Sequence, residues 1–184
     1  GVGMGIVVDG KLYQGATGIG AEFGHMVIEP AGEPCRCGKR GCIEAYAADS
    51  GIMQQARKLL SKRRNAPDLD MLNIEEVTRM ALEGDQGMRR LFSRSGESLA
   101  KGIAGLIQIF NPERIIITGE GVRAGDMVFK PMNRLLKKFT NTPQAQATQV
   151  VVQEWNDNDW AQGAAGLVLS EIYKSPLDRI QNTN

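Results

Sequence analysis

The sequence predicts an α/β domain, because short runs of β-branched residues alternate with longer segments of helical periodicity. Residues 114–118 form an isoleucine-rich run of the kind expected for a buried strand. Residues 148–153 form a second such run, and the segments around both runs carry apolar residues spaced three and four apart. With 184 residues the chain can bury a core, so we expect one domain over residues 1–175, followed by a tail over 176–184.

The first sixty residues predict mostly irregular structure that ends in a helix. β-branched residues flank Asp9 and Gly10, a pair that suits a type I′ hairpin turn. The expected elements are a hairpin over 4–14, a glycine-rich loop over 15–24, a short strand over 26–29 and a helix over 45–59.

The rest of the chain predicts helices and two strands. Gly102 and Gly105 lie in the third predicted helix and suggest a close approach of another element to its backbone. Pro131 is expected near the first turn of the helix that follows Gly121. The expected elements are helices over 74–82 and 88–110, a strand over 114–118, a helix that ends near Phe139, a strand over 148–153 and a helix over 160–173.

Composition excludes some classes of partner. A formal net charge of +1 creates no overall field that would attract nucleic acid or a membrane surface. The basic cluster at 58–64 ends a predicted helix, where a solvated helix end explains it. No apolar run is long enough for a membrane span, and no signal peptide is visible. Together with cysteines that look reduced, this predicts a cytoplasmic protein without a membrane partner.

The only histidine and all three cysteines lie within residues 25–42, a segment we call the knuckle. Three thiolates and an imidazole, from Cys35, Cys37, Cys42 and His25, are the ligands of a closed tetrahedral site, which predicts structural Zn²⁺. Two alternatives are free thiols and a redox-active Cys-x-Cys pair. A pure disulfide scheme leaves one thiol over, and Cys35 and Cys37 are too close to bridge without strain.

Two carboxylates, Glu22 and Glu44, flank the metal ligands. Closure around a metal would bring both to one small region, where paired carboxylates can accept hydrogen bonds from the hydroxyls of a sugar. An equal alternative is that Glu22 orients the ring of His25 while Glu44 begins a helix.

These residues resemble a known family. Residues 22–25 and the block from Cys35 to Glu44 resemble the signature of the ROK family of repressors, open reading frames and sugar kinases. Residues 1–5 resemble its glycine-rich phosphate segment, and residues 115–122 resemble its adenosine-side glycine turn. The resemblance implies an actin-like ATPase-domain (ribonuclease H-like) fold, of which this chain would be the C-terminal lobe with a zinc-knuckle insertion.

The resemblance also implies site residues. Glu22, His25 and Glu44 would contact the sugar, with His25 also binding the metal. The glycines of the nucleotide side would be Gly1, Gly3, Gly119 and Gly121.

Two departures from the family pattern predict that nucleotide binding is degraded. Val2 replaces a hydroxyl-bearing threonine, and Glu120 places a carboxylate in the turn that should hold the nucleotide. Like charges about 4 Å apart cost about 1 to 4 kcal/mol at surface-like dielectrics.

The expected function is therefore the effector-binding and dimerising portion of a ROK transcriptional repressor. This favours a protein that is not an enzyme but leaves an ATP-dependent sugar kinase open. A sugar or sugar derivative would be the effector, and DNA would be bound by a helix-turn-helix that, like the N-terminal lobe, lies outside this chain. The protein would form a homodimer or tetramer. One alternative is the C-terminal lobe of an ATP-dependent sugar kinase, whose catalytic aspartate would lie upstream of Gly1. Another is an interaction module that zinc merely braces.

Overall fold

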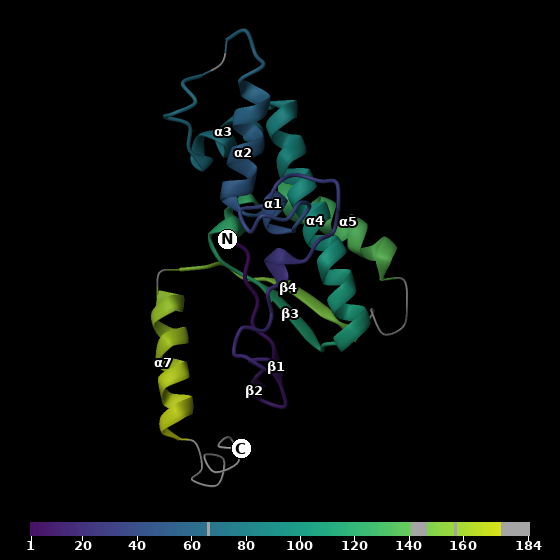
Figure 1. Cartoon of the computed structure of the whole chain (residues 1–184), viewed down its shortest axis with the longest axis vertical. Coiled ribbons are helices and arrows are strands. Elements are labelled where there is room, and N and C mark those ends of the chain that lie inside the picture. The colour runs from purple at the N-terminus through teal and green to yellow at the C-terminus, as the bar shows by residue number, and fades with distance from the viewer. Residues whose placement is uncertain (66, 141–146, 157, 174–184) are drawn as a thin grey trace.

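A helical body packs on one face of a two-stranded sheet, and a short hairpin and a C-terminal helix extend from it (Figure 1). The computed structural model describes residues 1–65, 67–140, 147–156 and 158–173. The predicted tail over 176–184 lies outside these residues. The strands are β1 (Val7–Val8), β2 (Lys11–Leu12), β3 (Arg114–Ile117) and β4 (Gln149–Val152). The helices are η1 (Phe23–His25), α1 (Glu44–Ala47), α2 (Asp49–Leu60), α3 (Ile74–Leu82), α4 (Gln86–Phe110), η2 (Glu120–Ala124), α5 (Asp126–Phe139) and α7 (Asn158–Ile172).

The strands confirm the α/β prediction but change one detail of it. β1 and β2 form the expected hairpin, in which Asp9 and Gly10 have φ values of 50° and 74°, as a type I′ turn requires. β3 and β4 pair in parallel. Only one face of this pair is covered, because Ile115 and Val150 pack against the core while Ile116 remains 54% exposed. The prediction that residues 114–118 form a fully buried strand is therefore wrong for the described chain.

The predicted helix over 45–59 is broken at Ala48, whose ψ of 150° is extended. The break lets α2 turn back on the end of α1, where Gln55 Nε2 donates to the carbonyl of Ala45 at 2.9 Å. Gly51 is required there, because a Cβ on it would lie 2.5 Å from that same carbonyl oxygen. The predicted strand over 26–29 is also wrong, since only Val27 forms a β-bridge, to Cys42.

The later helices follow the sequence closely. α3 has the predicted bounds, and Asn73 caps it by accepting from the backbone N–H of Glu76 at 2.8 Å. α4 ends at Asn111, which adopts the left-handed conformation with φ 43°. Pro131 lies in the second turn of α5, one turn later than predicted.

Two large hydrophobic clusters form most of the core, and α4 runs through both. A small third cluster lies in the knuckle and α1 and consists of Cys35, Cys42, Ala45 and Tyr46. The first cluster joins α2, α3, the first half of α4 and the start of α5. The second joins η1, the second half of α4, α5 and the inner face of the β3–β4 sheet. Its buried members are Phe23, Ile43, Ala100, Ile103, Ala104, Ile107, Met132 and Leu136. Phe23 and Ile43 flank the predicted site residues, so this cluster anchors the site to α4.

Gly102 is the point of closest approach between the site and α4. A Cβ at Gly102 would lie 2.4 Å from Ile43 and 2.7 Å from Phe23. We expect Gly102→Ala to lower the free energy of unfolding by about 1–3 kcal/mol, because it overpacks this contact. Chemical denaturation measures the change.

Gly105→Ala is the matched control, since open space surrounds Gly105. This substitution should be neutral or stabilise by up to about 1 kcal/mol through helix propensity. Equal destabilisation by both variants would contradict the close-contact interpretation of Gly102. The sequence also suggested a close approach at Gly105, and the open space around that residue shows that this prediction was wrong.

Asp85 joins the start of α4 to the end of the α2 region. Its carboxylate accepts from the backbone N–H groups of Gly87 and Met88 and forms an ion pair with Arg63, which holds the pKa of Asp85 at about 2. Because this pKa lies below the ordinary value, the stabilisation is complete above about pH 4 and is lost as the pH falls toward 2.

We therefore expect Asp85→Asn, which can still cap α4, to lower the free energy of unfolding by about 1–2 kcal/mol at neutral pH, with solvent screening included. The difference from the unsubstituted protein should vanish near pH 2 in urea titrations across pH. Asp126→Asn is the control, because Asp126 and its partner Lys130 are both 75% exposed. A loss at Asp85 that stays constant with pH would contradict the ion-pair account.

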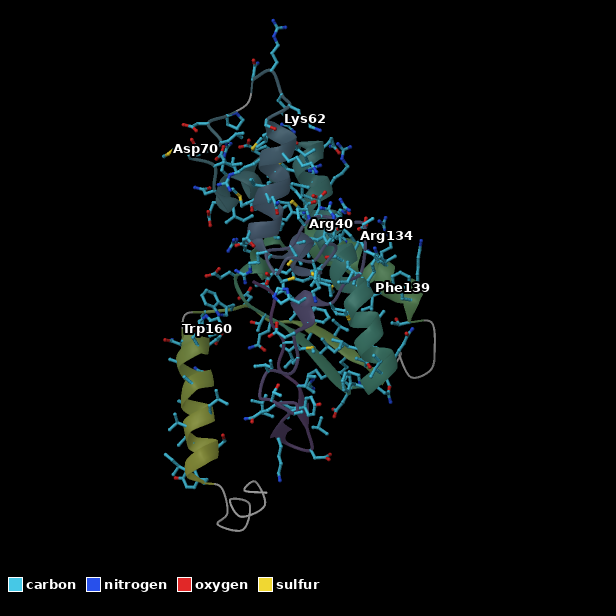
Figure 2. The ribbon with its side chains drawn as sticks, in the orientation of Figure 1. Arg40, Lys62, Asp70, Arg134, Phe139 and Trp160 are labelled. Atoms are coloured by element: carbon cyan, nitrogen blue, oxygen red, sulfur yellow. The ribbon has the colours of Figure 1, made fainter. Side chains whose placement is uncertain are left out.

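The C-terminal helix α7 stands apart from the helical body, with Trp160 at its beginning (Figures 1 and 2). Its apolar side chains are largely exposed, among them Trp160, Leu167, Val168 and Ile172. Among the described residues, the chain has no helix with the length and hydropathy that a bilayer crossing needs.

Candidate metal and ligand site

The structure brings the four predicted metal ligands together. One donor atom from each of His25, Cys35, Cys37 and Cys42 lies within 4.8 Å of every other. The Sγ atoms of Cys37 and Cys42 are 3.7 Å apart, and His25 Nδ1 is 3.7 Å from Cys35 Sγ. Metal–sulfur bonds of about 2.3 Å in a tetrahedron separate the sulfurs by about 3.8 Å. The group can therefore hold a metal ion.

Turns of the backbone direct the cysteines inward. The N–H of Cys35 donates to the carbonyl of Lys39 at 2.9 Å, and Gly38 returns a bond to the carbonyl of Cys35. Gly41 has a φ of 72°, and a Cβ there would lie 1.6 Å from the carbonyl oxygen of Glu29. Only glycine fits at this position of the knuckle.

The thiols have unequal proton affinities when no metal neutralises them. Burial raises the pKa of Cys42 to about 12, while a hydrogen bond from the backbone of Lys39 lowers that of Cys37. Three adjacent thiolates repel one another, so their joint ionisation calls for a bound cation. The donor chemistry of the group thus fits a metal.

His25 has two different environments at its two ring nitrogens. Nδ1 faces the thiols, and Nε2 is 3.9 Å from a carboxylate oxygen of Glu22. The Glu22 side chain is 69% exposed, so it stands at the surface beside the ring. Metal ligation through Nδ1 would leave an Nε2 proton directed outward, toward Glu22 and solvent.

Glu44 is the buried carboxylate of the site. It is the first residue of α1 and only 4% exposed. Oε2 accepts from the backbone N–H of Val2 at 3.2 Å and from Arg36 Nη2 at 3.5 Å. Arg36 Nε is 2.7 Å from Oε1 in an ion pair, and the buried Oε1 has no other polar partner among the described residues.

The charge state of Glu44 follows from these contacts. Burial alone would raise its pKa, but the Val2 N–H and the Arg36 guanidinium outweigh burial and lower the pKa. Glu44 is therefore an ionised acceptor at neutral pH, paired with the Arg36 guanidinium.

The N-terminal glycine segment lies against this carboxylate. A Cβ on Gly1 would be 3.2 Å from Glu44 Oε2, and a Cβ on Gly24 would be 2.2 Å from the carbonyl oxygen of Val2. Gly1 and Val2 thus contact both Glu44 and the segment that carries Glu22 and His25. Open space surrounds the predicted nucleotide-side glycines Gly3, Gly119 and Gly121.

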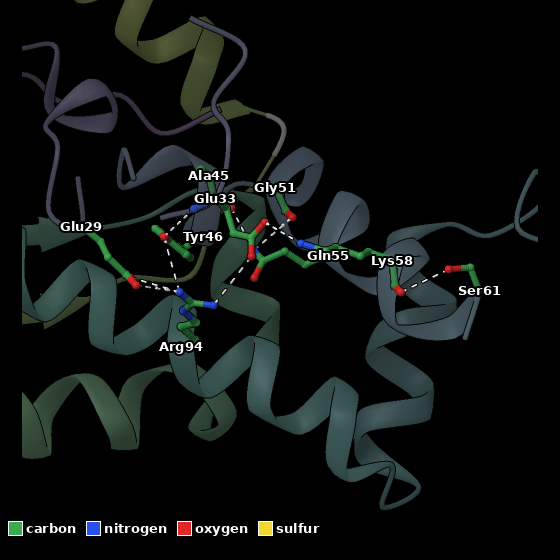
Figure 3. Close-up of polar contacts among 9 residues, drawn as sticks. All are labelled: Glu29, Glu33, Ala45, Tyr46, Gly51, Gln55, Lys58, Ser61 and Arg94. Atoms are coloured by element: carbon green, nitrogen blue, oxygen red, sulfur yellow. Dashed lines mark hydrogen bonds and ion pairs between the residues drawn. The ribbon is translucent and has the colours of Figure 1, made fainter. Parts of the chain in front are cut away.

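Sequence reasoning missed the residues that fasten the knuckle to α4 (Figure 3). Arg94 donates to both carboxylate oxygens of Glu29 at 3.1 Å, and its guanidinium lies 4.5 Å from the centre of the Tyr46 ring. The hydroxyl of Tyr46 accepts from the backbone N–H of Glu33 at 2.9 Å. No spacing rule connects Arg94 with Glu29, because 65 residues separate them.

Arg36 was missed as well, although its charge opposite Glu44 within the same short segment was a usable signal. Figure 2 places Arg40, of the same turn, at the middle of the molecule, well away from Lys62 and Asp70 at the far end of the α2–α3 region. The candidate site therefore lies where the two halves of α4 meet, and not at the helical tip.

The chain belongs to the ROK family, whose family model matches residues 1–171. Among its relatives, a glucokinase from Thermotoga maritima is 33% identical over 94% of this chain and 56% of its own length. The DNA-binding transcriptional dual regulator NagC from Escherichia coli is 35% identical over 91% of this chain and 41% of its own length. Both kinases and repressors are thus relatives.

A solved structure supports the fold. The ROK hexokinase from Thermus thermophilus superposes with a TM-score of 0.73 at 24% identity, over 85% of this chain and 51% of that one. The ROK fold implied by the resemblance, that of an actin-like ATPase lobe, is confirmed at this level. The chain spans about half the length of the relatives that it matches.

Proposed function

We propose that this chain is the effector-binding part of a sugar-responsive ROK transcriptional regulator. The observation that carries the proposal is the buried, ionised carboxylate of Glu44, whose Oε1 accepts no hydrogen bond in the described structure. The ion pair with the exposed Arg36 side chain covers Oε1, and movement of that side chain would let a sugar hydroxyl donate to the carboxylate. His25 Nε2 and Glu22 would add a second set of polar contacts.

The metal in this proposal is structural Zn²⁺. Three sulfurs and one imidazole nitrogen are the donors of closed zinc sites, and such sites keep no position for water. When bound, the ion would supply charge that keeps the thiolates ionised and fixes the turn. His25 would join both roles, with Nδ1 toward the metal and Nε2 toward the ligand.

Two features favour a regulator over a kinase. The backbone N–H of Val2, in the segment that resembles a phosphate-binding loop, is already used by Glu44, and its apolar side chain packs on the second core cluster. Glu120 begins η2 with an exposed carboxylate in the turn that would approach the nucleotide. An anionic phosphate is repelled by such a charge.

The DNA contact would be made by a helix-turn-helix outside this chain, in a homodimer or tetramer. The support is that NagC, a relative at 35% identity, is a DNA-binding transcriptional regulator. In this arrangement the sugar binds beside the knuckle and shifts the equilibrium between two conformations of the dimer. The two conformations would differ in how the dimer positions its two DNA-reading helices on neighbouring half-sites.

A ROK sugar kinase is the second candidate, favoured by the 33% identity to a glucokinase. In that case the catalytic aspartate lies in the part of the protein outside this chain, and Glu44 and His25 hold the sugar for phosphorylation.

Isothermal titration of the intact protein with a panel of sugars, together with DNA binding and ATP turnover in the same preparation, tests the proposal. We expect one sugar class to bind and to alter operator binding, without turnover of ATP. ATP-dependent phosphorylation of the bound sugar would instead support the kinase, and binding of no sugar would favour a bracing role for the metal.

A further inference from the structure

We propose that Arg94 of α4 is a positioning residue for the metal group, because it holds the turn from Glu29 to Glu33 in place. The inference rests on the metal site of the proposed function and does not depend on the sugar. The described polar contacts of Arg94 include none of the four metal ligands, so its effect on the metal passes through this turn.

The four metal ligands fall into two groups along the chain. The three cysteines share one local turn, which the N–H of Cys35 closes by donating to the carbonyl of Lys39 at 2.9 Å. His25 precedes this turn, and residues 26–34 join the two. The imidazole therefore meets the thiols only while this connecting segment keeps its folded path. The conformation of residues 26–34 thus determines whether the group has three ligands or four.

Arg94 contacts both ends of the turn within this connecting segment (Figure 3). Its Nη2 donates to both carboxylate oxygens of Glu29 at 3.1 Å, and its Nη1 is 4.0 Å from a carboxylate oxygen of Glu33. The guanidinium also lies 4.5 Å from the centre of the Tyr46 ring. A planar guanidinium can hold two carboxylates and stack on a ring at the same time, which the single ammonium of a lysine cannot do.

The turn itself packs directly on Tyr46. A Cβ on Gly32 would lie 1.9 Å from the Tyr46 hydroxyl, and this hydroxyl accepts from the backbone N–H of Glu33 at 2.9 Å. Arg94 and Tyr46 therefore support the same short stretch of backbone. A shift of that stretch would move His25 relative to the cysteine turn.

Arg94 is also the polar link between the knuckle and α4. Its hydrogen bond lowers the pKa of Glu29, so the carboxylate is ionised at neutral pH and the contact is charge-assisted. Within the described ranges, no other side chain of α4 forms a hydrogen bond with the knuckle. Arg90 and Lys101 line the same groove beside the knuckle but have no described ion pair.

Holding the ligands in place before the metal arrives should increase metal affinity. A preorganised site loses less conformational freedom on binding than a flexible one. Residues outside the ligand set that orient the ligands typically change metal affinity by about 10- to 100-fold. Arg94 would act in this way through the path of the backbone.

Competition for Zn²⁺ between the intact, reduced, metal-free protein and a chromophoric chelator tests the inference. We expect Arg94→Gln to weaken Zn²⁺ binding by about 10- to 100-fold. Arg90→Gln is the matched control, because it removes the same charge from the same helix and groove, and it should keep the affinity within about 3-fold.

A double-mutant cycle separates positioning from a general loss of stability. Glu29→Gln should weaken Zn²⁺ binding as much as Arg94→Gln does, and the double variant should bind no more weakly than either single variant. Simple destabilisation of α4 by Arg94→Gln would instead add to the effect of Glu29→Gln. Glu29 is 42% exposed, so its variant keeps the test available should Arg94→Gln not fold.

Three results would overturn the inference. Zn²⁺ affinities of Arg94→Gln or Glu29→Gln within about 3-fold of the unsubstituted protein would reject the positioning role and leave the metal site in place. Additive losses in the cycle would reject the link through Glu29. An unsubstituted protein that binds no Zn²⁺ would remove the metal site and the inference together, and sugar titration of the same preparation shows whether sugar binding survives.

Discussion

Cys37→Ser is expected to release the metal and, with it, to weaken ligand binding. Cys37 is the exposed ligand of the group, so serine fits its place without disturbing the core. Mutating a residue that merely supports a metal ligand typically lowers metal affinity by roughly 10- to 100-fold. Loss of a thiolate ligand itself should lower it by more. The segment from Glu22 to Glu44 should then exchange amide hydrogens faster, since Cys35 and Cys42 are no longer held to His25.

Metal analysis, hydrogen exchange and sugar titration measure this prediction. A strong chelator should reproduce the effect in the unsubstituted protein, and added Zn²⁺ should reverse it. Arg40→Ser, which places the same residue at an exposed position of the same turn, should keep its metal. Protein purified without chelator that holds less than about half an equivalent of zinc would contradict the four-ligand site.

Glu44→Gln is expected to abolish detectable sugar binding, with a loss of about 100-fold or more. The substitution keeps the size of the side chain and an acceptor for the N–H of Val2, but it removes the charge that strengthens hydrogen bonds from hydroxyl groups. The partner left behind, Arg36, is exposed, so it stays solvated and the fold should persist. Calorimetry measures the affinity, and thermal unfolding checks the fold.

Glu22→Gln is the control for Glu44→Gln, because it removes the other predicted sugar-binding carboxylate. Glu22 is 69% exposed and its described contact is with His25, so we expect a loss of only about 3- to 10-fold. A large loss at Glu22 with little change at Glu44 would reverse the assignment of the two carboxylates. It would also contradict Oε1 of Glu44 as the ligand acceptor.

The sequence was informative wherever local rules decide structure. The Asp9–Gly10 turn and the bounds of α3 follow from residues within a few positions of each other. The metal group was equally accessible, because its ligands lie close together in the chain and no other histidine or cysteine competes with them.

Distant contacts explain what could not be predicted. Ala48 breaks a periodic helix because Gln55 and Gly51 pack on the end of α1, a tertiary effect that periodicity does not contain. Arg94 reaches Glu29 from another helix, and only the fold brings them together. The assignment of Glu22 and Glu44 as sugar contacts, and of zinc as the metal, remains a prediction that the experiments above address.

The uninterrupted length of α4 has a mechanical consequence. At 25 residues it is about 37 Å long. It contacts the knuckle through Arg94, and it contacts Phe23 and Ile43 at Gly102. Because α4 packs in both large core clusters, a shift at one of its ends would be transmitted to the other. A tilt of only about 5° about one end, driven by a small shift at Glu29, would displace the opposite end by about 3 Å. A ligand that moves the knuckle by a fraction of a bond length would thus displace the far end of α4 by a larger distance.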